Sequence, residues 1–425
     1  MTRVLSVLLI IIILTSHPAD CQISHAGILP GAYQTTEYLK LLKGRKVAVF
    51  ANHTSVIKHT HLIDTLIKSN ITVVKIFAPE HGFRGVANAG ETVNNSIDSA
   101  TGIPIISLYG KHTKPTEADL KNVDIILFDI QDVGVRFYTY ISSLEELMEA
   151  AIDNDKPLIV LDRPNPNGFY IAGPVLDSSY KSFVGKQCVP VVYGMTIGEY
   201  AKMLIGEKML TWSYVRKIDD QIHLGQLFGF EDKKENFNLT VIKCKNYTHT
   251  SKYILPIAPS PNLPDMASIY WYPSNCLFEG TVVSEGRGTE HPFCIIGHPS
   301  FKNAPFSFTP VSNRGANNPK FVNTICNGWN CWIDYTTNTL IKYPGFKVTF
   351  LKKAYQMMED KSSFFIKSHD SYFFNKLAGN NILMKQIEEG VSENDIINSW
   401  QKDIDAFKKI RKKYLLYPDF ETLGK

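Results

Sequence analysis

The stretch from Phe77 to Gly85 concentrates acidic, basic and cationic side chains within nine residues. Glu80, His81 and Arg84 directly follow an apolar run over residues 71–77, which predicts a buried strand. In an open α/β sheet, ligands bind beyond the carboxyl ends of the strands. A carboxylate, an imidazole and a guanidinium in that place could transfer protons and bind an anionic group. We therefore expect one wall of a ligand site here, and the alternative is an ordinary polar turn with glycine at positive φ.

The same pattern recurs after three further predicted strands, over residues 46–51, 123–129 and 157–162. Their ends carry polar clusters: Asn52 and His53; Asp129, Gln131, Asp132 and Arg136; Asp162, Arg163, Asn165 and Asn167. Polar loops are common at both edges of a sheet. Acids and bases at nearly every strand end instead favour an active-site edge where these side chains gather.

A second polar concentration lies further along the chain. Glu279, Glu285 and Arg287 stand among three glycines. The alternative interpretation is a glycine-rich hairpin with exposed charges. Residues 258–264 precede it and hold three prolines, so they predict a rigid extended segment that presents Ser260 and Asn262.

The elements that must position these residues alternate along the chain. Helical spacing over residues 61–69 and 142–153 separates the predicted strands, which indicates an α/β fold with a doubly wound, mostly parallel sheet. Residues 196–205 predict a helix that Thr196 and Glu199 cap, and residues 392–413 predict a C-terminal helix. The length of 425 residues exceeds what one core usually supports, so we expect two domains. Residues 211–252 are polar and mixed, a plausible boundary, and we place it at residues 250/251.

Composition and motifs argue against several classes of ligand. The net charge of +4 is small for this length, which argues against a nucleic-acid partner. The first strand is followed by Asn52-His-Thr-Ser55 in place of G-x-G-x-x-G, and the chain has no P-loop, so we expect no nucleotide cofactor. No His/Asp spacing is typical of a metal site, so we predict no metal.

The N-terminal residues predict where the protein is located. Arg3 precedes an apolar run over residues 4–14, and small residues follow, which is typical of a secretory signal peptide over residues 1–21. No later segment is apolar enough to cross a membrane. We therefore expect a secreted protein, extracellular or periplasmic. Six cysteines then remain, and Cys326 and Cys331 are close enough in sequence to close a small loop.

Several reactions would use these groups. Glycoside hydrolysis needs two carboxyl groups, and Glu80 or Glu279 could be the proton donor. Arg84, Arg136, Arg163 and Arg287 indicate a ligand that carries a carboxylate or phosphate. A serine hydrolase is disfavoured because the chain has no G-x-S-x-G elbow. A metal-dependent hydrolase using His53, His81, Asp129 and Asp132 and a non-catalytic sugar- or anion-binding protein are the alternatives.

Seven motifs occur in an order that resembles a known family. They are Asn52-His-Thr, Pro79-Glu-His-Gly-Phe-Arg-Gly85, Ser107-Leu-Tyr-Gly110, residues 128–140, residues 161–168, Ser260-Pro-Asn262, and Glu279-Gly-Thr with Gly286-Arg-Gly-Thr289. Together they are similar to the exo-β-N-acetylmuramidase family of bacterial glycosidases. The resemblance runs from about Lys46 to the C-terminus.

The resemblance implies a fold, a substrate and a set of roles. It implies a Rossmann-like domain followed by a smaller auxiliary α/β domain, with the cleft between them. It implies release of terminal N-acetylmuramic acid from the non-reducing end of peptidoglycan fragments. Glu80 corresponds to the favoured catalytic residue, and we assign Glu279 as its partner carboxylate. Residues expected to shape the site or bind substrate are Asn52, His81, Arg84, Asp129, Gln131, Asp132, Arg136, Arg163, Asn262 and Arg287. The position of Glu285 is less fixed in that family, so it is a poorer candidate.

Overall fold

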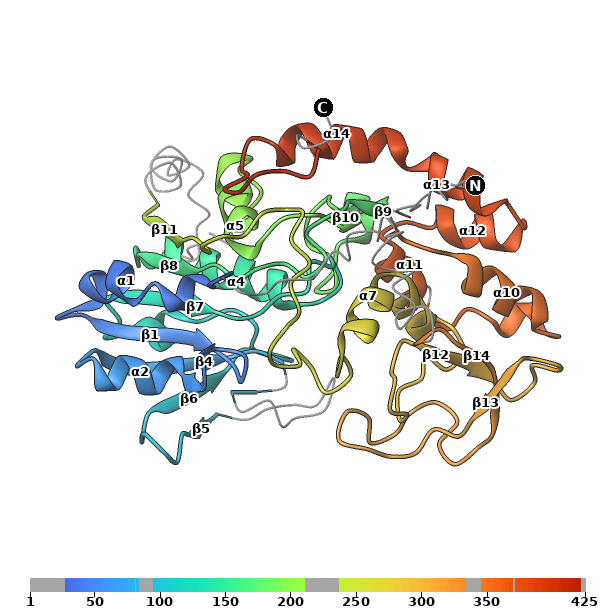
Figure 1. Cartoon of the computed structure of the whole chain (residues 1–425), viewed down its shortest axis with the longest axis horizontal. Helices are drawn as coiled ribbons and strands as arrows, with labels where there is room; N and C mark the ends of the chain where they lie inside the picture. Colours follow the sequence, from blue (N-terminus) through green and yellow to red (C-terminus); the bar gives the residue numbers. More distant parts are fainter. Residues whose placement is uncertain are drawn as a thin grey trace, which may run out of the picture.

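The computed structural model of the chain describes residues 27–80, 82–83, 95–210, 237–332, 345–369 and 371–421. A larger part holds a mostly parallel sheet with helices on both faces, and a smaller C-terminal part lies beside it (Figure 1). Among the described residues, no helix combines the length and apolar character that crossing a membrane requires. The predicted signal peptide lies outside the described residues.

The seven-stranded sheet has the order β11-β8-β7-β1-β4-β6-β5. Its strands are β1 (Lys46–Ala51), β4 (Thr72–Ala78), β5 (Ser96–Ile97), β6 (Pro104–Ser107), β7 (Ile125–Asp129), β8 (Leu158–Leu161) and β11 (Leu239–Ile242). Every neighbouring pair is parallel except β5 with β6. This arrangement confirms the predicted doubly wound α/β fold. The edge strand β11 falls in a region that the sequence indicated only as polar and mixed.

Alternating side chains of the central strands face two different helix layers, as a doubly covered sheet requires. Val47, Val49 and Ala51 pack with α1 (Thr35–Leu42) and α2 (Leu62–Lys68). Ala48 and Phe50 pack with α4 (Tyr140–Asp153) and α5 (Ile197–Gly206) on the other face. Shorter elements connect these layers: β2 (Val56–Ile57), β3 (Thr60–His61), α3 (Glu117–Leu120), β9 (Ala172–Val175) and β10 (Pro190–Val192).

The smaller part is built from a three-stranded antiparallel sheet and short helices. The sheet has the order β12-β14-β13, formed by β12 (Ile295–His298), β13 (Phe306–Phe308) and β14 (Cys326–Asn330). The helices are α7 (Met266–Asn275), α10 (Thr349–Met357), α11 (Phe373–Ala378), α12 (Ile382–Glu388), α13 (Glu393–Ser399) and α14 (Gln401–Arg411). The hairpin β15 (Lys367–Ser368) and β16 (Ser371–Tyr372) completes it.

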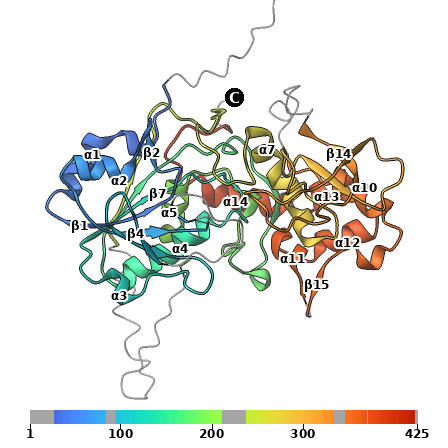
Figure 2. The same cartoon turned by 90° about the horizontal axis from the view of Figure 1, so that it is seen from below.

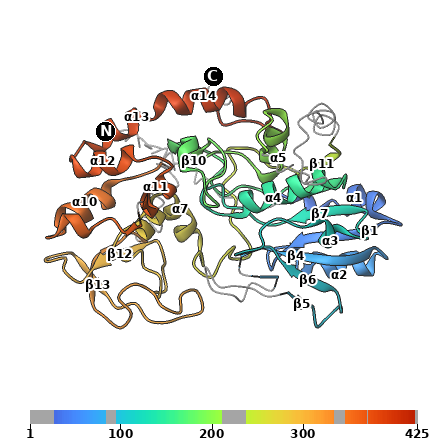
Figure 3. The ribbon, with the colours of Figure 1, turned by 180° about the vertical axis from the view of Figure 1, so that it is seen from behind.

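Helix α14 carries the end of the chain back to the larger part, as two opposite views show (Figures 1 and 3). Arg411 Nε donates to the carbonyl oxygen of Gly194 at 2.8 Å, and the Tyr414 hydroxyl donates to Glu207 Oε1 at 2.6 Å. Seen from below, the seven-stranded sheet and helices α10 to α13 lie at opposite ends of the molecule, with α14 and α5 between them (Figure 2). The C-terminal segment therefore joins the two parts rather than trailing from one of them.

Two predictions about local structure were wrong. The helix expected over residues 392–413 is divided at Trp400, whose buried ring packs against Phe346.

The expected Cys326–Cys331 loop is also wrong, because both cysteines lie along the extended strand β14 and its end. Five residues of strand span roughly 17 Å, whereas disulfide-linked Cα atoms lie within about 7 Å. Cys331 instead faces Cys294, whose carbonyl oxygen accepts its backbone N–H at 2.7 Å.

Candidate active site

An open pocket of about 410 Å³ lies where the ends of the parallel strands meet the smaller part. Glu80 and Arg287 both line this pocket. Glu80 comes from the larger part and Arg287 from the smaller part. The other lining residues are Phe137, Tyr138, Thr139, Tyr140, Ser260, Asn262, Leu263, Tyr272 and Phe293. A carboxylate, a guanidinium, hydroxyl groups and aromatic rings thus surround one space, which is the composition of a ligand site.

Glu80 follows β4 after Ala78 and Pro79, and its side chain is half-buried. The hydroxyl of Thr139 donates to Glu80 Oε2 at 3.2 Å, and the Tyr109 hydroxyl forms a second hydrogen bond to the same carboxyl group. Thr139 directly precedes α4, and Tyr109 follows β6. Three separate strand ends or loops therefore fix this carboxyl group at the pocket wall.

Glu279 reaches the same region through Arg287. Arg287 Nη2 donates to Glu279 Oε1 at 2.6 Å, and its Nε lies 3.4 Å from Glu285 Oε1. Lys320 Nζ pairs with the other oxygen of Glu285 at 2.9 Å. Burial alone would raise the pKa of Glu285, but Lys320 and Arg287 outweigh it and lower that pKa below its usual value. Burial alone would lower the pKa of Arg287, but Glu279 and Glu285 together raise it.

Glycine determines the turn that presents Arg287. Gly286 and Gly288 on either side have φ of +80° and +79°, a region that L side chains rarely adopt. A Cβ at Gly286 would also lie 2.4 Å from the carbonyl oxygen of Ile295. The glycines that suggested an ordinary hairpin are thus the means by which the guanidinium enters the pocket.

Asn262 supplies an acceptor at the pocket wall. Its Nδ2 donates to the carbonyl oxygen of Gly315 at 2.7 Å, and a carbonyl can only accept, so the orientation of the amide is fixed. Asn262 is 2% exposed, and its Oδ1 has no hydrogen-bond partner among the described residues. The segment over residues 258–264 does bring Asn262 to the site, but the predicted extended conformation is wrong for part of it. Residues 260–263 form a turn, in which the backbone N–H of Leu263 donates to the carbonyl oxygen of Ser260 at 3.0 Å.

Asp129 and Arg163 lie away from the pocket wall and bind each other. Arg163 Nε donates to Asp129 Oδ1 at 2.6 Å and Nη2 to Oδ2 at 2.8 Å, and both side chains are buried. Gln131 is also buried, with its amide donating to the carbonyl oxygens of Asp132 and Pro164 at 2.8 Å. These contacts tie neighbouring strand ends together, so we reassign the three predicted site residues to supporting the edge of the sheet.

Arg136 has no exposed surface. Its Nη1 donates to the carbonyl oxygens of Pro174 and Val189, and its Nη2 donates to those of Leu377 and Ala378. Burial without a carboxylate partner lowers the pKa of Arg136 to about 9. Its four contacts join the larger part to α11, which argues against the predicted substrate contact.

Two more predicted residues stand behind the wall. Asn52 is buried and donates from Nδ2 to the hydroxyl of Tyr140 at 2.9 Å, so it supports a lining residue. Asp132 is buried, accepts hydrogen bonds from the Tyr193 hydroxyl and from the backbone N–H of Gly134, and burial raises its pKa to about 6. Neither lines the pocket. The predicted site residues His81 and Arg84 lie outside the described residues.

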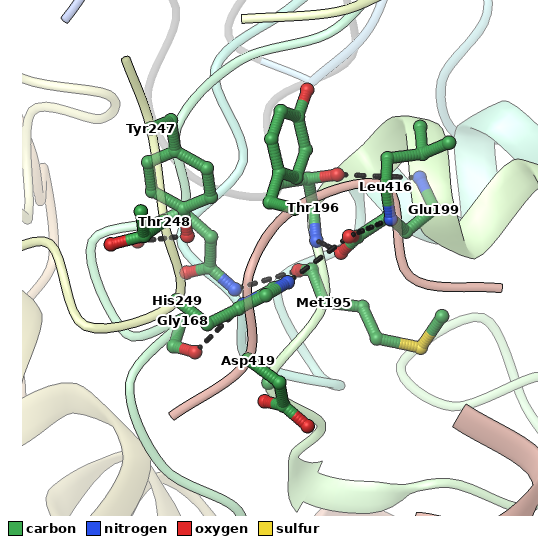
Figure 4. A network of polar contacts seen from close by, with 12 residues as sticks. Gly168, Met195, Thr196, Glu199, Tyr247, Thr248, His249, Leu416 and Asp419 are labelled. Atoms are coloured by element: carbon green, nitrogen blue, oxygen red, sulfur yellow. Dashed lines mark hydrogen bonds and ion pairs between the residues drawn. The ribbon is translucent and has the colours of Figure 1, made fainter. Parts of the chain in front are cut away.

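A third strand-end carboxylate, Asp162, belongs to a separate buried network, which we call the tail-anchoring network. Thr196 Oγ1 and the Tyr417 hydroxyl donate to Asp162 Oδ2 at 2.7 and 2.5 Å. Glu199 Oε1 accepts the backbone N–H of Leu416 at 2.7 Å and lies 3.0 Å from His249 Nε2 (Figure 4). The predicted capping box of Thr196 and Glu199 is confirmed, and it also fastens the C-terminal segment.

Sequence reasoning did not single out Tyr109, Thr139 or the aromatic lining of the pocket. Tyr109 lies in the quoted motif Ser107-Leu-Tyr-Gly110, and Thr139 lies in the motif over residues 128–140. A hydroxyl directly beyond a strand end was the available signal. Charged residues at the strand ends are a stronger signal in the sequence than single hydroxyl groups. Within the described ranges, no three His, Cys, Asp or Glu side chains gather as metal ligands would.

Comparison with known proteins assigns the family. The model described as exo-β-N-acetylmuramidase NamZ, N-terminal, matches residues 47–267, and its C-terminal counterpart matches residues 270–417. A relative from Bacillus subtilis (strain 168), the peptidoglycan β-N-acetylmuramidase NamZ, is 38% identical over 407 residues, which are 90% of this chain and 89% of that protein.

Two crystal structures of DUF1343 family proteins from Bacteroides fragilis NCTC 9343 also resemble this chain. One has a TM-score of 0.79 at 44% identity, and the other has 0.68 at 28% identity. Each comparison covers 92% of this chain and 99% of the other. The two family models, the curated relative and these structures lead to one conclusion: the chain belongs to the exo-β-N-acetylmuramidase NamZ family of exo-acting glycosidases.

Proposed function

We propose that this protein hydrolyses peptidoglycan fragments by removing N-acetylmuramic acid from their non-reducing ends. The observation that carries the proposal is an open pocket whose wall holds Glu80 and Arg287, with Glu279 paired to that arginine at 2.6 Å. Glycosidases use two carboxyl groups that flank the scissile bond. The relative named for activity on peptidoglycan supports the same substrate class.

The surroundings of the two carboxyl groups support different roles. Glu80 lines the pocket and contacts hydroxyl groups, so we assign to it proton transfer to the glycosidic oxygen. Glu279 forms an ion pair with Arg287, which holds it as an anion. We assign to Glu279 the stabilisation of positive charge that develops on the sugar ring.

Recognition of the sugar is assigned to the remaining wall. The rings of Tyr272 and Phe293 pack edge to face, with centroids 4.8 Å apart, and offer an apolar surface to the sugar and its methyl groups. Asn262 Oδ1 is assigned as acceptor for an N–H or O–H of the sugar. Arg287 is paired with both Glu279 and Glu285. We therefore assign to it the neutralisation of these two carboxylates rather than the binding of an anionic group of the substrate.

Release of sugar tests the proposal. The wild-type protein is incubated with a chromogenic β-N-acetylmuramide and with the matching β-N-acetylglucosaminide. We expect chromophore release from the muramide and much slower release from the glucosaminide. Glu80→Gln should abolish release while the far-UV circular dichroism spectrum stays unchanged.

Other outcomes would select the alternatives. Binding of the muramide without release would favour the sugar-binding protein. Loss of activity with a chelator, restored by added metal, would favour a metal-dependent hydrolase. Full activity of Glu80→Gln would remove Glu80 from the mechanism.

We further propose that the protein is secreted and that residues 1–21 are removed. The apolar run after Arg3 supports this proposal. Expression of the full chain in a secreting host should yield a mature protein that begins at Gln22, which N-terminal sequencing measures. An intact N-terminus on protein retained in the cells would contradict it.

A further inference from the structure

Tyr109 stands opposite Glu80 because of the strand register. In the parallel pair β4–β6, Ala78 lies beside Ser107, and the backbone N–H of Leu108 donates to the carbonyl oxygen of Ala78 at 2.8 Å. Two residues beyond this pair, the chain reaches Glu80 on one strand and Tyr109 on the other. The register of the sheet therefore brings the two residues close to each other at the ends of neighbouring strands.

The surroundings of Tyr109 keep its proton in place. Its hydroxyl forms a hydrogen bond with the Glu80 carboxyl group, and the charges of Glu279 and Arg287 act on it from the smaller part. Burial first, and then Glu80 and Glu279, raise the pKa of Tyr109 well above its ordinary value, while Arg287 lowers it in part. A neutral O–H donor consequently remains beside the Glu80 carboxyl group across the pH range of ordinary assays.

A neutral donor suits this position better than a cation would. A lysine or arginine there would form an ion pair with Glu80 and hold it as an anion, as Arg287 does for Glu279. A hydroxyl group can donate to a carboxylate and accept from a carboxylic acid. It can therefore hold Glu80 in one orientation in both protonation states that proton transfer requires.

We propose that Tyr109 is a positioning residue that orients the Glu80 carboxyl group toward the glycosidic oxygen and separates it from the Glu279–Arg287 pair. The proposal rests on the proposed glycosidase function. Thr139 makes the second hydrogen bond to Glu80, so the two hydroxyl groups restrain the carboxyl group from two sides.

The test replaces Tyr109 with phenylalanine, which keeps the ring and removes the hydroxyl. We expect kcat on the chromogenic muramide to fall about 10–100-fold, because a misplaced catalytic group costs that much, with KM within a factor of two. A change confined to kcat would separate loss of orientation at the reacting group from loss of substrate binding, which would raise KM.

A matched control is Tyr414→Phe. The Tyr414 hydroxyl also donates to a carboxylate, Glu207, at 2.6 Å, but this pair lies on the C-terminal segment and lines no part of the pocket. The control removes the same kind of hydrogen bond and should leave kcat and KM unchanged. A purely structural role of Tyr109 would lower the melting temperature and leave kcat per folded molecule unchanged, which would overturn the proposal.

A second measurement does not depend on catalysis. Carboxyl carbon-13 NMR of the glutamate-labelled protein follows the Glu80 signal, which is identified by its absence in Glu80→Gln. The chemical shift of this signal should change in Tyr109→Phe and not in Tyr414→Phe, even if the muramide proves not to be the substrate. An unchanged chemical shift in Tyr109→Phe would overturn the proposal, whereas absence of hydrolysis by the wild type would overturn only the proposed function.

Discussion

The pocket and the tail-anchoring network each contain carboxylates, and they differ in which groups form hydrogen bonds with the carboxylate oxygens. In the network, Asp162 and Glu199 have no exposed surface, and the protein's own hydroxyl, backbone and imidazole groups surround their oxygens. At the pocket, Glu80 is half-buried and lines open space. Two carboxylates of similar sequence context thus have opposite relations to solvent.

The difference shows how to distinguish a structural acid from a chemical one. When the oxygens of a buried carboxylate accept several hydrogen bonds from fixed protein donors, no position is left for a substrate. Its removal should affect stability. A carboxylate that keeps an oxygen toward a pocket can act on a substrate, so its removal should affect rate.

The largest effect is expected from Glu80→Gln. We expect kcat/KM on a chromogenic muramide to fall by at least about 10³-fold, because proton transfer at the glycosidic oxygen is lost. Glu80 is half-buried, so the free energy of unfolding in urea should change by less than about 1 kcal/mol. An equal loss of activity and stability would remove the distinction between the two regions.

The matched substitution in the network is Glu199→Gln. The backbone N–H groups of Leu416 and Thr196 each donate to a different oxygen of Glu199, so one of them would face an amide NH₂ group. Leaving one of these buried N–H groups without an acceptor should cost about 1–3 kcal/mol in the free energy of unfolding. The kcat per folded molecule should stay within a factor of two, and a selective loss of kcat would place the network in catalysis.

Stability against pH gives a further contrast. Burial raises the pKa of Glu145 from 4.5 to about 7 and that of Asp162 to about 7, so the folded protein keeps protons that the unfolded chain releases. Stability should therefore fall as pH rises from about 4.5 to about 7 and level off above that range. The Glu145→Gln variant should reduce this slope by up to about 1.4 kcal/mol per pH unit, as urea unfolding at several pH values measures.

The Glu145 prediction has an internal control. Glu145 accepts from the Tyr200 hydroxyl at 2.7 Å and from Gln187 Nε2 at 2.7 Å, and a glutamine can keep both contacts once the hydroxyl turns. The same slope in Glu145→Gln and wild type would contradict a buried, proton-holding carboxyl group.

The smallest effect is expected at Asn262. Loss of the acceptor Oδ1 in Asn262→Ala should raise KM for the muramide about 3–10-fold, the equivalent of one hydrogen bond, with kcat little changed. Asn327→Ala is the control, because its Oδ1 accepts from Ser307 on the exposed face of β14. An unchanged KM in Asn262→Ala would exclude the acceptor role.

Much of the sheet could be predicted from sequence because its signals are local. The strand over residues 46–51 and the cap by Thr196 and Glu199 follow from short patterns of apolar residues and capping side chains. Glu80 could be singled out because a strand signal ends abruptly in charged residues. The division at Trp400 could not, since the packing of its ring against Phe346 overrides helical periodicity.

By itself, the sequence determined that parallel strands end in polar clusters, that Glu80 belongs to one of them, and that Glu279 lies in a second polar concentration. Tertiary structure alone decided which clusters face a pocket. It paired Asp129 with Arg163, enclosed Arg136 among backbone carbonyls and placed Tyr109 beside Glu80. The physical reason is that a residue type sets which hydrogen bonds are available, whereas only long-range packing sets whether the protein or a ligand occupies them.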